Sequence, residues 1–247
     1  MITSKDNPKL KLVRRLGERG DRRREGLFLS EGEDLLQAGL AAGWTPSFVL
    51  VAATEQGEGA AVPASGVEAL RVEARLLDAV SSLGSGSRMI AVWPLPEAAA
   101  WPADPGGPTT YLHGVADPGN VGTIIRSVDA LRGGSVALGP GAADPYGPKA
   151  VRASMGSIFT VEVRCEVAFA TTPAPRVALV AHGGEPLAAL VGATTLVLGA
   201  ERGGIPPSLL ALSDRRVTIG LRERGAESLN VAAAAAIALQ RLSSPGR

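Results

Sequence analysis

Four short segments in the second half of the chain have residue types and spacing that could bind a ligand. The first is Asp117-Pro118-Gly119-Asn120-Val121-Gly122, which follows an apolar stretch and leads into a helical pattern. Its glycines allow a close backbone approach, and the start of a helix offers unpaired N–H groups to an anion. The same residues are also typical of a turn and helix cap, so this segment alone leaves both interpretations open.

The second segment is Leu198-Gly199-Ala200-Glu201-Arg202-Gly203-Gly204, in which glycines surround one carboxylate. It matches neither GxGxxG nor GxxxxGK[ST], so it favours neither a dinucleotide-binding fold nor a nucleotidase. A short glycine-rich loop can wrap a small ligand through its backbone, or it can be a tight turn.

The third segment is Glu227-Ser228-Leu229-Asn230-Val231, followed by five alanines. Ser228 is a candidate N-cap for a helix over 228–242. Asn230 is a poor helix former, which indicates a specific hydrogen bond. The alanines predict close packing of this helix, either at a subunit interface or as a result of the high Ala content. The charged stretch 222–227 before it indicates a solvated loop or an RNA contact.

Basic residues mark two further places. Lys149 and Arg152 are spaced i,i+3 in the fourth segment, and residues 1–25 hold nine basic against four acidic side chains although the whole chain carries only +1. Leu10, Val13 and Leu16 are interleaved with them, so the pattern predicts an amphipathic helix with one buried stripe. Its other face could bind phosphates or simply be solvated.

Apolar runs predict the elements that must position these segments. Strands are expected at 48–52, 89–93, 110–115, 135–139, 160–164, 176–181, 194–200 and 216–221, and helices at 31–42, 73–83, 119–131, 147–156, 206–212 and 228–242. Alternation of strands and helices after residue 109 predicts an α/β fold with a parallel sheet covered on both faces. Ligands bind such sheets at the carboxyl ends of the strands, which directs attention to the loops after residues 115, 139, 181, 200 and 221.

The proline-rich stretch 94–108 cannot continue a helix or a central strand, and 53–66 and 84–88 are expected to be a loop and a turn. We therefore predict a small α/β domain at 1–93, a linker at 94–108 and a second domain at 109–247.

Composition excludes several classes of protein. A single cysteine, Cys165, expected to be buried at a strand end, excludes an intramolecular disulfide framework and a cysteine zinc site. Two histidines leave little basis for a metal site, and no metal is expected. Aromatic residues make up 4%, which argues against stacking of bases on an aromatic platform. No long apolar run or apolar leader is present, so a reduced, cytoplasmic protein is expected.

The order of the motifs is more specific than any one of them. DPGNVGTIIRS, PKAVRASMGSIF, LVLGAERGGIP and ESLNVAAAAAIAL resemble the successive motifs of the SpoU (TrmH-type) branch of the SPOUT methyltransferases across residues 111–242. The N-terminal part resembles the substrate-binding domain, similar to a small α/β ribosomal protein, that precedes this catalytic domain in ribosomal-RNA members. The resemblance implies transfer of a methyl group from S-adenosylmethionine to a ribose 2′-hydroxyl of RNA, a deep trefoil knot in the sheet, and a homodimer.

The resemblance also implies roles for residues of this chain. The polar set expected around the transferred methyl group and the RNA is Asn120, Arg126, Glu201, Ser228 and Asn230. The set expected to hold the cofactor is Leu198, Gly199, Gly203, Ile219, Leu221 and Leu229. Charge and spacing, rather than the resemblance, select the basic residues expected to contact RNA, which are Lys9, Arg14, Arg15, Arg22, Arg23, Arg24, Lys149 and Arg152. Gly220 stands where the family usually has proline.

A ribose hydroxyl is a weak nucleophile and needs alignment, charge stabilisation and a proton acceptor. We expect Arg126, which stays protonated, to clamp a phosphate and stabilise the developing alkoxide while the proton leaves through the phosphate or a water. Asn120 and Arg126 lie six positions apart, and the two side chains are expected to point broadly alike if Asn120 is already helical. Glu201 is expected to orient the substrate or Asn120, or else to bind its own loop.

The basic N-terminal part favours 23S ribosomal RNA as the substrate. A tRNA 2′-O-methyltransferase and a non-catalytic RNA-binding ribosome-assembly factor are the alternatives. A dinucleotide-dependent oxidoreductase is disfavoured because its glycine fingerprint is absent.

Overall fold

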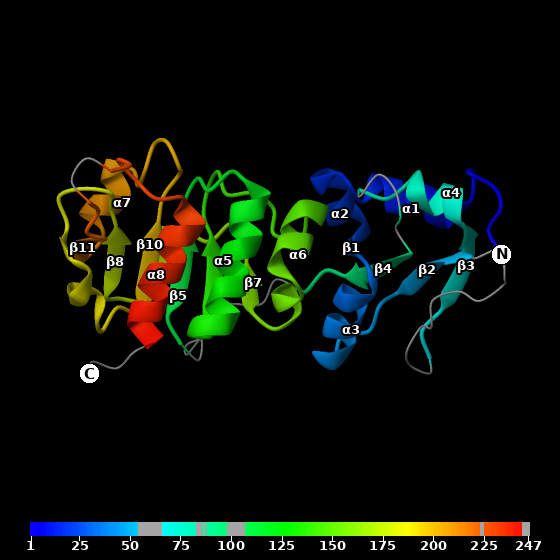
Figure 1. The fold of residues 1–247 in the computed structure, drawn as a ribbon, viewed down its shortest axis with the longest axis horizontal. Helices are drawn as coiled ribbons and strands as arrows, with labels where there is room; N and C mark the ends of the chain where they lie inside the picture. Colours follow the sequence, from blue (N-terminus) through cyan, green and yellow to red (C-terminus); the bar gives the residue numbers. More distant parts are fainter. Residues whose placement is uncertain (54–65, 83–85, 87, 98–106, 223–224, 244–247) are drawn as a thin grey trace. The chain divides into compact units, whose positions relative to one another are not determined.

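The structure is a computed structural model that describes residues 1–53, 66–82, 86, 88–97, 107–222 and 225–243. Most of the predicted 53–66 loop, 84–88 turn and 94–108 linker lies outside these residues. Packing divides the chain into two units, Met1–Glu97 with Tyr146–Phe159 and Ala98–Pro145 with Thr160–Arg247. Figure 1 shows the ribbon of both units, coloured from blue at the N-terminus to red at the C-terminus. We keep the domain boundary at 94–108 as a proposal.

The first unit is built on a four-stranded mixed sheet in the order β1-β4-β2-β3. The strands are β1 Leu27–Glu31, β2 Phe48–Ala53, β3 Ala69–Glu73 and β4 Met89–Pro94. The β4 strand pairs antiparallel with β1 and β2, and β2 pairs parallel with β3. The helices are α1 Pro8–Arg15, α2 Arg19–Glu25, α3 Glu33–Ala41 and α4 Ala74–Asp78. The predicted strands at 48–52 and 89–93 are confirmed, whereas the helix predicted at 73–83 is shorter.

The amphipathic N-terminal helix is confirmed by the burial of Leu10, Val13 and Leu16. Asn7 caps α1, because its side chain accepts a hydrogen bond from Lys9 N at 2.9 Å. The basic region contains two helices rather than one, since α1 ends before Gly17 and α2 begins at Arg19.

An aromatic cluster joins a distant segment to the first unit. Helix α6 (Pro148–Ser154) and the following 3₁₀ turn η1 (Ser157–Phe159) pack in this unit, although their sequence lies between strands of the other. Phe159 lies against Trp93, with ring centroids 4.7 Å apart, and accepts a hydrogen bond from Trp44 Nε1 at 2.9 Å. Phe28 and Tyr146 complete the cluster. Five of the nine aromatic residues thus pack together here rather than forming an exposed platform for bases.

The second unit contains the predicted parallel sheet, which is confirmed. Its seven strands run in the order β7-β6-β5-β10-β8-β11-β9, with parallel pairing throughout. Their bounds are β5 Thr109–Leu112, β6 Ser135–Leu138, β7 Glu162–Arg164, β8 Arg176–Leu179, β9 Glu185–Pro186, β10 Thr195–Leu198 and β11 Arg215–Thr218. Cys165, directly after β7, is exposed, so its predicted burial is wrong.

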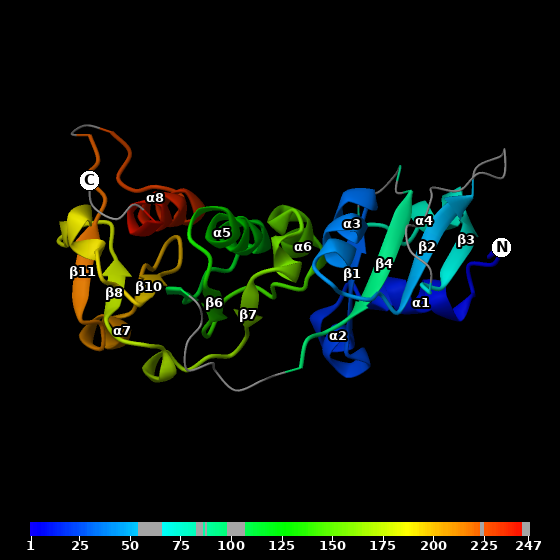
Figure 2. The ribbon, with the colours of Figure 1, turned by 90° about the horizontal axis from the view of Figure 1, so that it is seen from below.

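Helices cover both faces of this sheet. Helices α5 (Pro118–Leu131) and α8 (Val231–Ser243) lie on one face and α7 (Pro207–Ala211) on the other, as Figure 2 shows. Short 3₁₀ turns lie at Phe169–Thr171 (η2) and Leu187–Leu190 (η3). Ala232 and Ala235 of the alanine run are buried, and α8 packs on α5. Part of the alanine run is therefore explained within one chain. No helix in the described ranges is both long and apolar enough to cross a membrane.

Candidate functional site

A cavity of about 440 Å³ opens at the carboxyl ends of β8, β10 and β11. Its walls come from 179–182 after β8, 198–205 after β10, Ile219 and Leu221 after β11, and Glu227, Ser228, Leu229, Val231 and Ala234 around the start of α8. The volume is in the range of small-molecule sites. Three of the five loops selected from the sequence, those after 181, 200 and 221, meet here.

The loop after β10 is both a tight turn and a cavity wall. Ala200 and Gly204 exchange backbone hydrogen bonds of 3.1 and 2.9 Å, and Gly204 has φ +63°. A Cβ on Gly199 would lie 2.5 Å from Ile205 N and closer still to the Gly204 carbonyl. Only glycine fits at position 199, because the returning backbone leaves no room for a side chain.

A chain of hydrogen bonds joins this loop to the starts of α5 and α8. Asn120 Nδ2 donates to Glu201 Oε1 at 2.8 Å, and Asn230 Nδ2 donates to Asn120 Oδ1 at 3.1 Å. The backbone N–H of Asn120 donates to Asp117 Oδ1 at 3.0 Å, so Asp117 is the N-cap of α5. The Asn120 amide is thereby held from both ends, with Glu201 on one side and Asn230 on the other.

Asn230, not Ser228, caps helix α8. Its Oδ1 accepts hydrogen bonds from Ala232 N at 2.9 Å and Ala233 N at 3.3 Å, and α8 begins at Val231. The predicted N-cap role of Ser228 is therefore wrong. Ser228 lies outside the helix, where it is exposed and lines the cavity.

Arg126 lies apart from this group. It is exposed on α5, does not line the cavity, and forms no hydrogen bond or ion pair with another residue in the described part of the chain. At about 100° per residue, six residues turn Arg126 about 120° away from Asn120 around the helix. The expectation that the two side chains point alike is wrong for this reason.

The residues expected to hold the cofactor all lie at the cavity. They are Leu198, Gly199, Gly203, Ile219, Leu221 and Leu229. Glu201 and Ser228 also line the cavity. Asn120 and Asn230 do not line it, but Asn120 is hydrogen-bonded to Glu201 and Asn230 is hydrogen-bonded to Asn120. A Cβ on Gly220 would meet no atom within 4 Å, so the position has room for a Cβ where the family usually has proline.

Sequence reasoning missed three polar residues of the cavity wall: His182, Arg202 and Glu227. His182 could have been found from its position directly after residue 181, the end of a predicted strand. Arg202 and Glu227 could have been found because they adjoin the selected residues Glu201 and Ser228. Among the residues that the structure describes, no group of three or more His, Cys, Asp or Glu could hold a metal ion.

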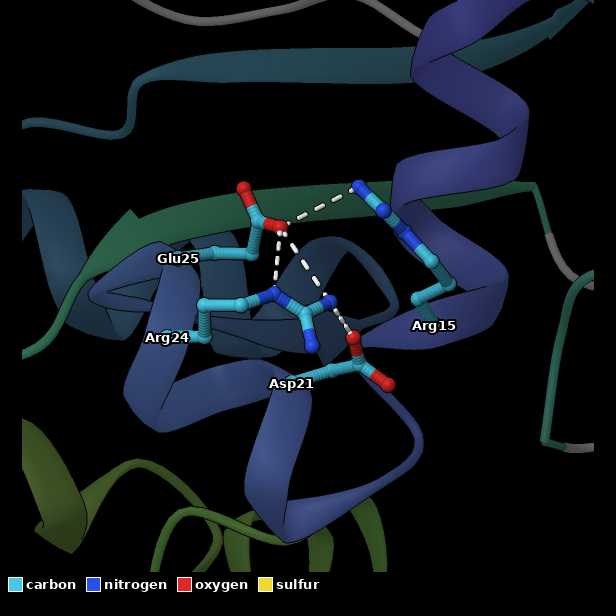
Figure 3. Close-up of polar contacts among 4 residues, drawn as sticks. All are labelled: Arg15, Asp21, Arg24 and Glu25. Carbon is cyan, nitrogen blue, oxygen red and sulfur yellow. Dashed lines mark hydrogen bonds and ion pairs between the residues drawn. The ribbon is translucent and has the colours of Figure 1, made fainter.

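The basic residues expected to contact RNA differ in their surroundings. Arg15 pairs with Glu25 at 3.2 Å, and Arg24 contacts both Asp21 and Glu25 (Figure 3). Lys9 pairs with Glu68 at 3.4 Å. Arg14, Arg23 and Lys149 are exposed. Pairs at this degree of exposure are weak, so their cations stay open to exchange with phosphates.

Arg22 does not belong to the RNA-contacting set, contrary to expectation. It is only 4% exposed, and its Nη1 donates to Leu16 O at 2.7 Å and Gly17 O at 2.8 Å. The guanidinium therefore caps the end of α1 from inside the unit, where no phosphate can reach it.

Lys149 and Arg152 lie on α6 and so belong to the first unit. Arg152 Nη1 donates to Ser82 Oγ at 3.4 Å. The eight basic residues of the expected RNA-contacting set thus fall in one packing unit, although two of them come from the second half of the chain, whereas Arg126 lies in the second unit.

Comparisons with known proteins match two parts of the chain, and the match to the later part includes α6, which packs in the first unit. Residues 109–240 match the SpoU rRNA Methylase family, and residues 7–91 match the MRM3-like substrate binding domain. The chain is 29% identical to the 23S rRNA (guanosine(2553)-2′-O)-methyltransferase RlmP of Bacillus subtilis, with 98% of each chain covered.

Solved structures give the same result. The SpoU methyltransferase AviRb from Streptomyces viridochromogenes, in complex with AdoMet, superposes with a TM-score of 0.83 at 26% identity, covering 95% of this chain and 96% of that one. A putative RNA methyltransferase of the TrmH family from Porphyromonas gingivalis gives 0.79 at 30% identity, with 98% of each chain covered.

Proposed function

The chain belongs to the SpoU rRNA methylase family, and from this premise we propose that it methylates a ribose 2′-hydroxyl of 23S ribosomal RNA. It is an RNA 2′-O-methyltransferase that uses S-adenosylmethionine. The finer assignment to 23S rRNA draws support from RlmP of Bacillus subtilis, whose name gives that substrate and which aligns along 98% of both chains.

The cavity is the observation that carries this proposal. Its glycine-rich wall and strand-end position suit a cofactor held largely through backbone groups. Cavity residues Gly199, Ile219 and Leu229 would hold the cofactor there, together with Leu198, Gly203 and Leu221. When bound, S-adenosylmethionine supplies an electrophilic methyl group.

The hydrogen-bonded group beside the cavity is suited to orienting the nucleotide. Glu201 fixes Asn120, and Asn120 retains one amide hydrogen and one lone pair to face a ribose. Ser228, at the cavity wall, offers a further hydroxyl. Alignment of this kind lowers the barrier when the nucleophile is weak.

Arg126 has a separate part in the proposal. An arginine stays protonated at neutral pH, so it is unsuited to accept the proton of the 2′-hydroxyl. Its exposed, unpaired position among the described residues suits a clamp on an RNA phosphate, from which it stabilises the developing alkoxide. The proton then leaves through the phosphate or a water.

The first unit is proposed to bind the RNA through Lys9, Arg14, Arg15, Arg23, Arg24, Lys149 and Arg152. The match of residues 7–91 to a substrate-binding domain supports this role for the five residues of the N-terminal helices, and Lys149 and Arg152 are included because α6 packs in the same unit. We further propose a homodimer, a trefoil knot in the sheet of the second unit and a cytoplasmic location, as expected for this family and for a chain with one cysteine.

Methyl transfer to separated RNA pools tests the proposal. Purified protein is incubated with labelled S-adenosylmethionine and unmodified 23S rRNA, 16S rRNA or tRNA, and the modified nucleotide is mapped. Label in 23S rRNA, lost in the Glu201→Ala variant, is the expected result. Label only in tRNA would show that tRNA, rather than 23S rRNA, is the substrate. Absence of S-adenosylmethionine binding in calorimetry would favour a non-catalytic assembly factor.

A further inference from the structure

Glu227, the last residue of the charged stretch 222–227, lines the cavity that is proposed to hold the cofactor. We propose that Glu227 is a specificity-determining residue that favours the positively charged sulfonium of the methyl donor over the neutral thioether of the product. This inference rests on the proposed function, because it assigns a role to a residue in the proposed cofactor site.

Glu227 lies on the cavity wall just before helix α8. Gly225 N donates to Arg222 O at 3.2 Å, and a Cβ on Gly225 would lie 3.1 Å from that carbonyl oxygen. Glu227, Ser228 and Leu229 then line the cavity, and α8 begins at Val231. The carboxylate of Glu227 is therefore placed at the wall by the residues that lead into the helix.

Glu227 differs from the other carboxylate of the cavity. Glu201 already accepts a hydrogen bond from Asn120 at 2.8 Å. Glu227 is exposed and forms no hydrogen bond or ion pair with any other residue within the described ranges. The remaining charge on the wall is Arg202, and His182 is the other titratable group. Most of the wall otherwise consists of apolar residues and glycine. Both carboxylates attract a ligand cation, but Glu201 is held by Asn120, whereas Glu227 has no hydrogen-bond or ion-pair partner among the described residues and can turn towards a ligand.

The chemistry of the transfer supplies the charge difference that Glu227 would sense. A lone pair of the ribose 2′-oxygen forms a bond to the methyl carbon, and the carbon–sulfur bond breaks with both electrons passing to sulfur. The sulfonium becomes a thioether and loses its positive charge, while the hydroxyl proton leaves to the phosphate or water. Cofactor and product therefore differ by one unit of positive charge at sulfur and by one methyl group. A carboxylate nearby attracts only the first.

The effect expected of a solvent-accessible carboxylate is modest. Exposed charge pairs contribute up to about 1 kcal/mol, which corresponds to about a fivefold change in affinity. Such a preference would still matter for turnover, because it weakens product binding relative to the donor.

Calorimetry with three ligands tests the inference. The ligands are S-adenosylmethionine, its amine analogue sinefungin, in which a protonated amine replaces the sulfonium methyl, and S-adenosylhomocysteine. Glu227→Gln is expected to weaken the two charged ligands about fivefold and to leave S-adenosylhomocysteine within about twofold. Glu227→Asp, which retains the charge, should keep most of the preference. Glu185→Gln, an exposed carboxylate of the same unit outside the cavity, is the matched control.

The outcomes separate the inference from the function on which it rests. Equal weakening of all three ligands by Glu227→Gln would overturn the inference, because it would place Glu227 near a group that donor and product share. No change for any ligand would overturn it as well. If the wild-type protein binds none of the three, the proposed function itself fails.

Discussion

Asn120 donates its side-chain amide to Glu201 Oε1 at 2.8 Å, across 81 positions of sequence. The bond ties the first turn of α5 to the loop that lines the cavity. Glu201→Ala removes the acceptor, and we expect the rate of methyl transfer to fall about 10- to 100-fold, the range for a hydrogen bond to a charged group. Glu201→Gln keeps an oxygen acceptor and should lose about fivefold.

Single-turnover transfer of labelled methyl groups measures this effect, with cofactor affinity measured separately. If Glu201→Gln is as damaging as Glu201→Ala, the negative charge matters rather than the orientation of Asn120.

Asn230 combines a cap for α8 with a link to Asn120, and two substitutions separate these roles. Asn230→Ser retains a capping side chain but is too short to reach Asn120, so stability should stay near wild type while activity falls. Asn230→Ala loses both, and the free energy of unfolding should fall by about 1 kcal/mol. Denaturant titration alongside the activity assay distinguishes the variants; equal stability for both would contradict the capping role.

Gly199 and Gly203 form a matched pair in one loop. A Cβ at Gly199 would run into the backbone of Gly204 and Ile205, whereas nothing lies within 4 Å of a Cβ at Gly203. Gly199→Ala should destabilise the protein by about 1–3 kcal/mol and weaken S-adenosylmethionine binding, since the loop must shift. Gly203→Ala should leave the stability nearly unchanged. Thermal unfolding and calorimetry check both, and a tolerated Gly199→Ala would show that the loop yields easily.

Arg22 and Arg14 have opposite roles despite being close in sequence. Loss of the buried Arg22 leaves the Leu16 and Gly17 carbonyls without their donor, so Arg22→Gln should destabilise the protein by about 2–4 kcal/mol. Arg14→Gln should leave stability unchanged and weaken RNA binding, with a shallower dependence of affinity on salt. RNA-binding titrations at several salt concentrations, together with denaturant unfolding, test both variants. Weaker RNA binding by Arg22→Gln and lower stability of Arg14→Gln would show that the two roles are assigned the wrong way round.

Tyr111 provides a test at alkaline pH. Burial raises the pKa of its hydroxyl above the ordinary value of 10.0, and the hydroxyl donates to Val167 O at 3.2 Å. Above about pH 10 the unfolded chain loses this proton while the folded protein retains it, so the free energy of unfolding falls as pH rises. Tyr111→Phe should be less stable near neutral pH by about 1 kcal/mol and should show a flatter alkaline decline. Denaturant unfolding at a series of alkaline pH values measures this. The prediction is contradicted if the free energy of unfolding falls equally with pH in the wild-type protein and in Tyr111→Phe.

Much of the second unit could be predicted from sequence because its strands are short apolar runs between glycine-rich turns. Parallel strands bring their carboxyl ends to one edge, so the pattern of strands was enough to select the loops that form the cavity. Strands β1, β3 and the two-residue β9 were not predicted. The exposed or half-buried positions of β3 at Ala69, Leu70 and Arg71 lack the continuous apolar run by which the other strands were found.

Contacts between residues far apart in sequence account for the other features that the sequence did not predict. The Asn120–Asn230 hydrogen bond spans 110 positions, and local pattern could assign Asn230 only to the helix rather than to its cap. The burial of Arg22 depends on two carbonyls freed where α1 ends, which its basic neighbourhood concealed. The packing of α6 in the first unit depends on Tyr146 and Phe159 meeting Phe28 and Trp93, and no local period encodes such a meeting.

This last arrangement has a consequence for synthesis on the ribosome. The first 97 residues emerge with Phe28, Trp44 and Trp93 but without Phe159, the ring that lies against both tryptophans. The nascent first unit therefore cannot complete its aromatic core until translation has passed position 159, by which time β5, β6 and α5 have also been made. N-terminal folding is thus coupled in time to the appearance of the second unit, and a fragment ending in the linker would carry an unfilled apolar surface.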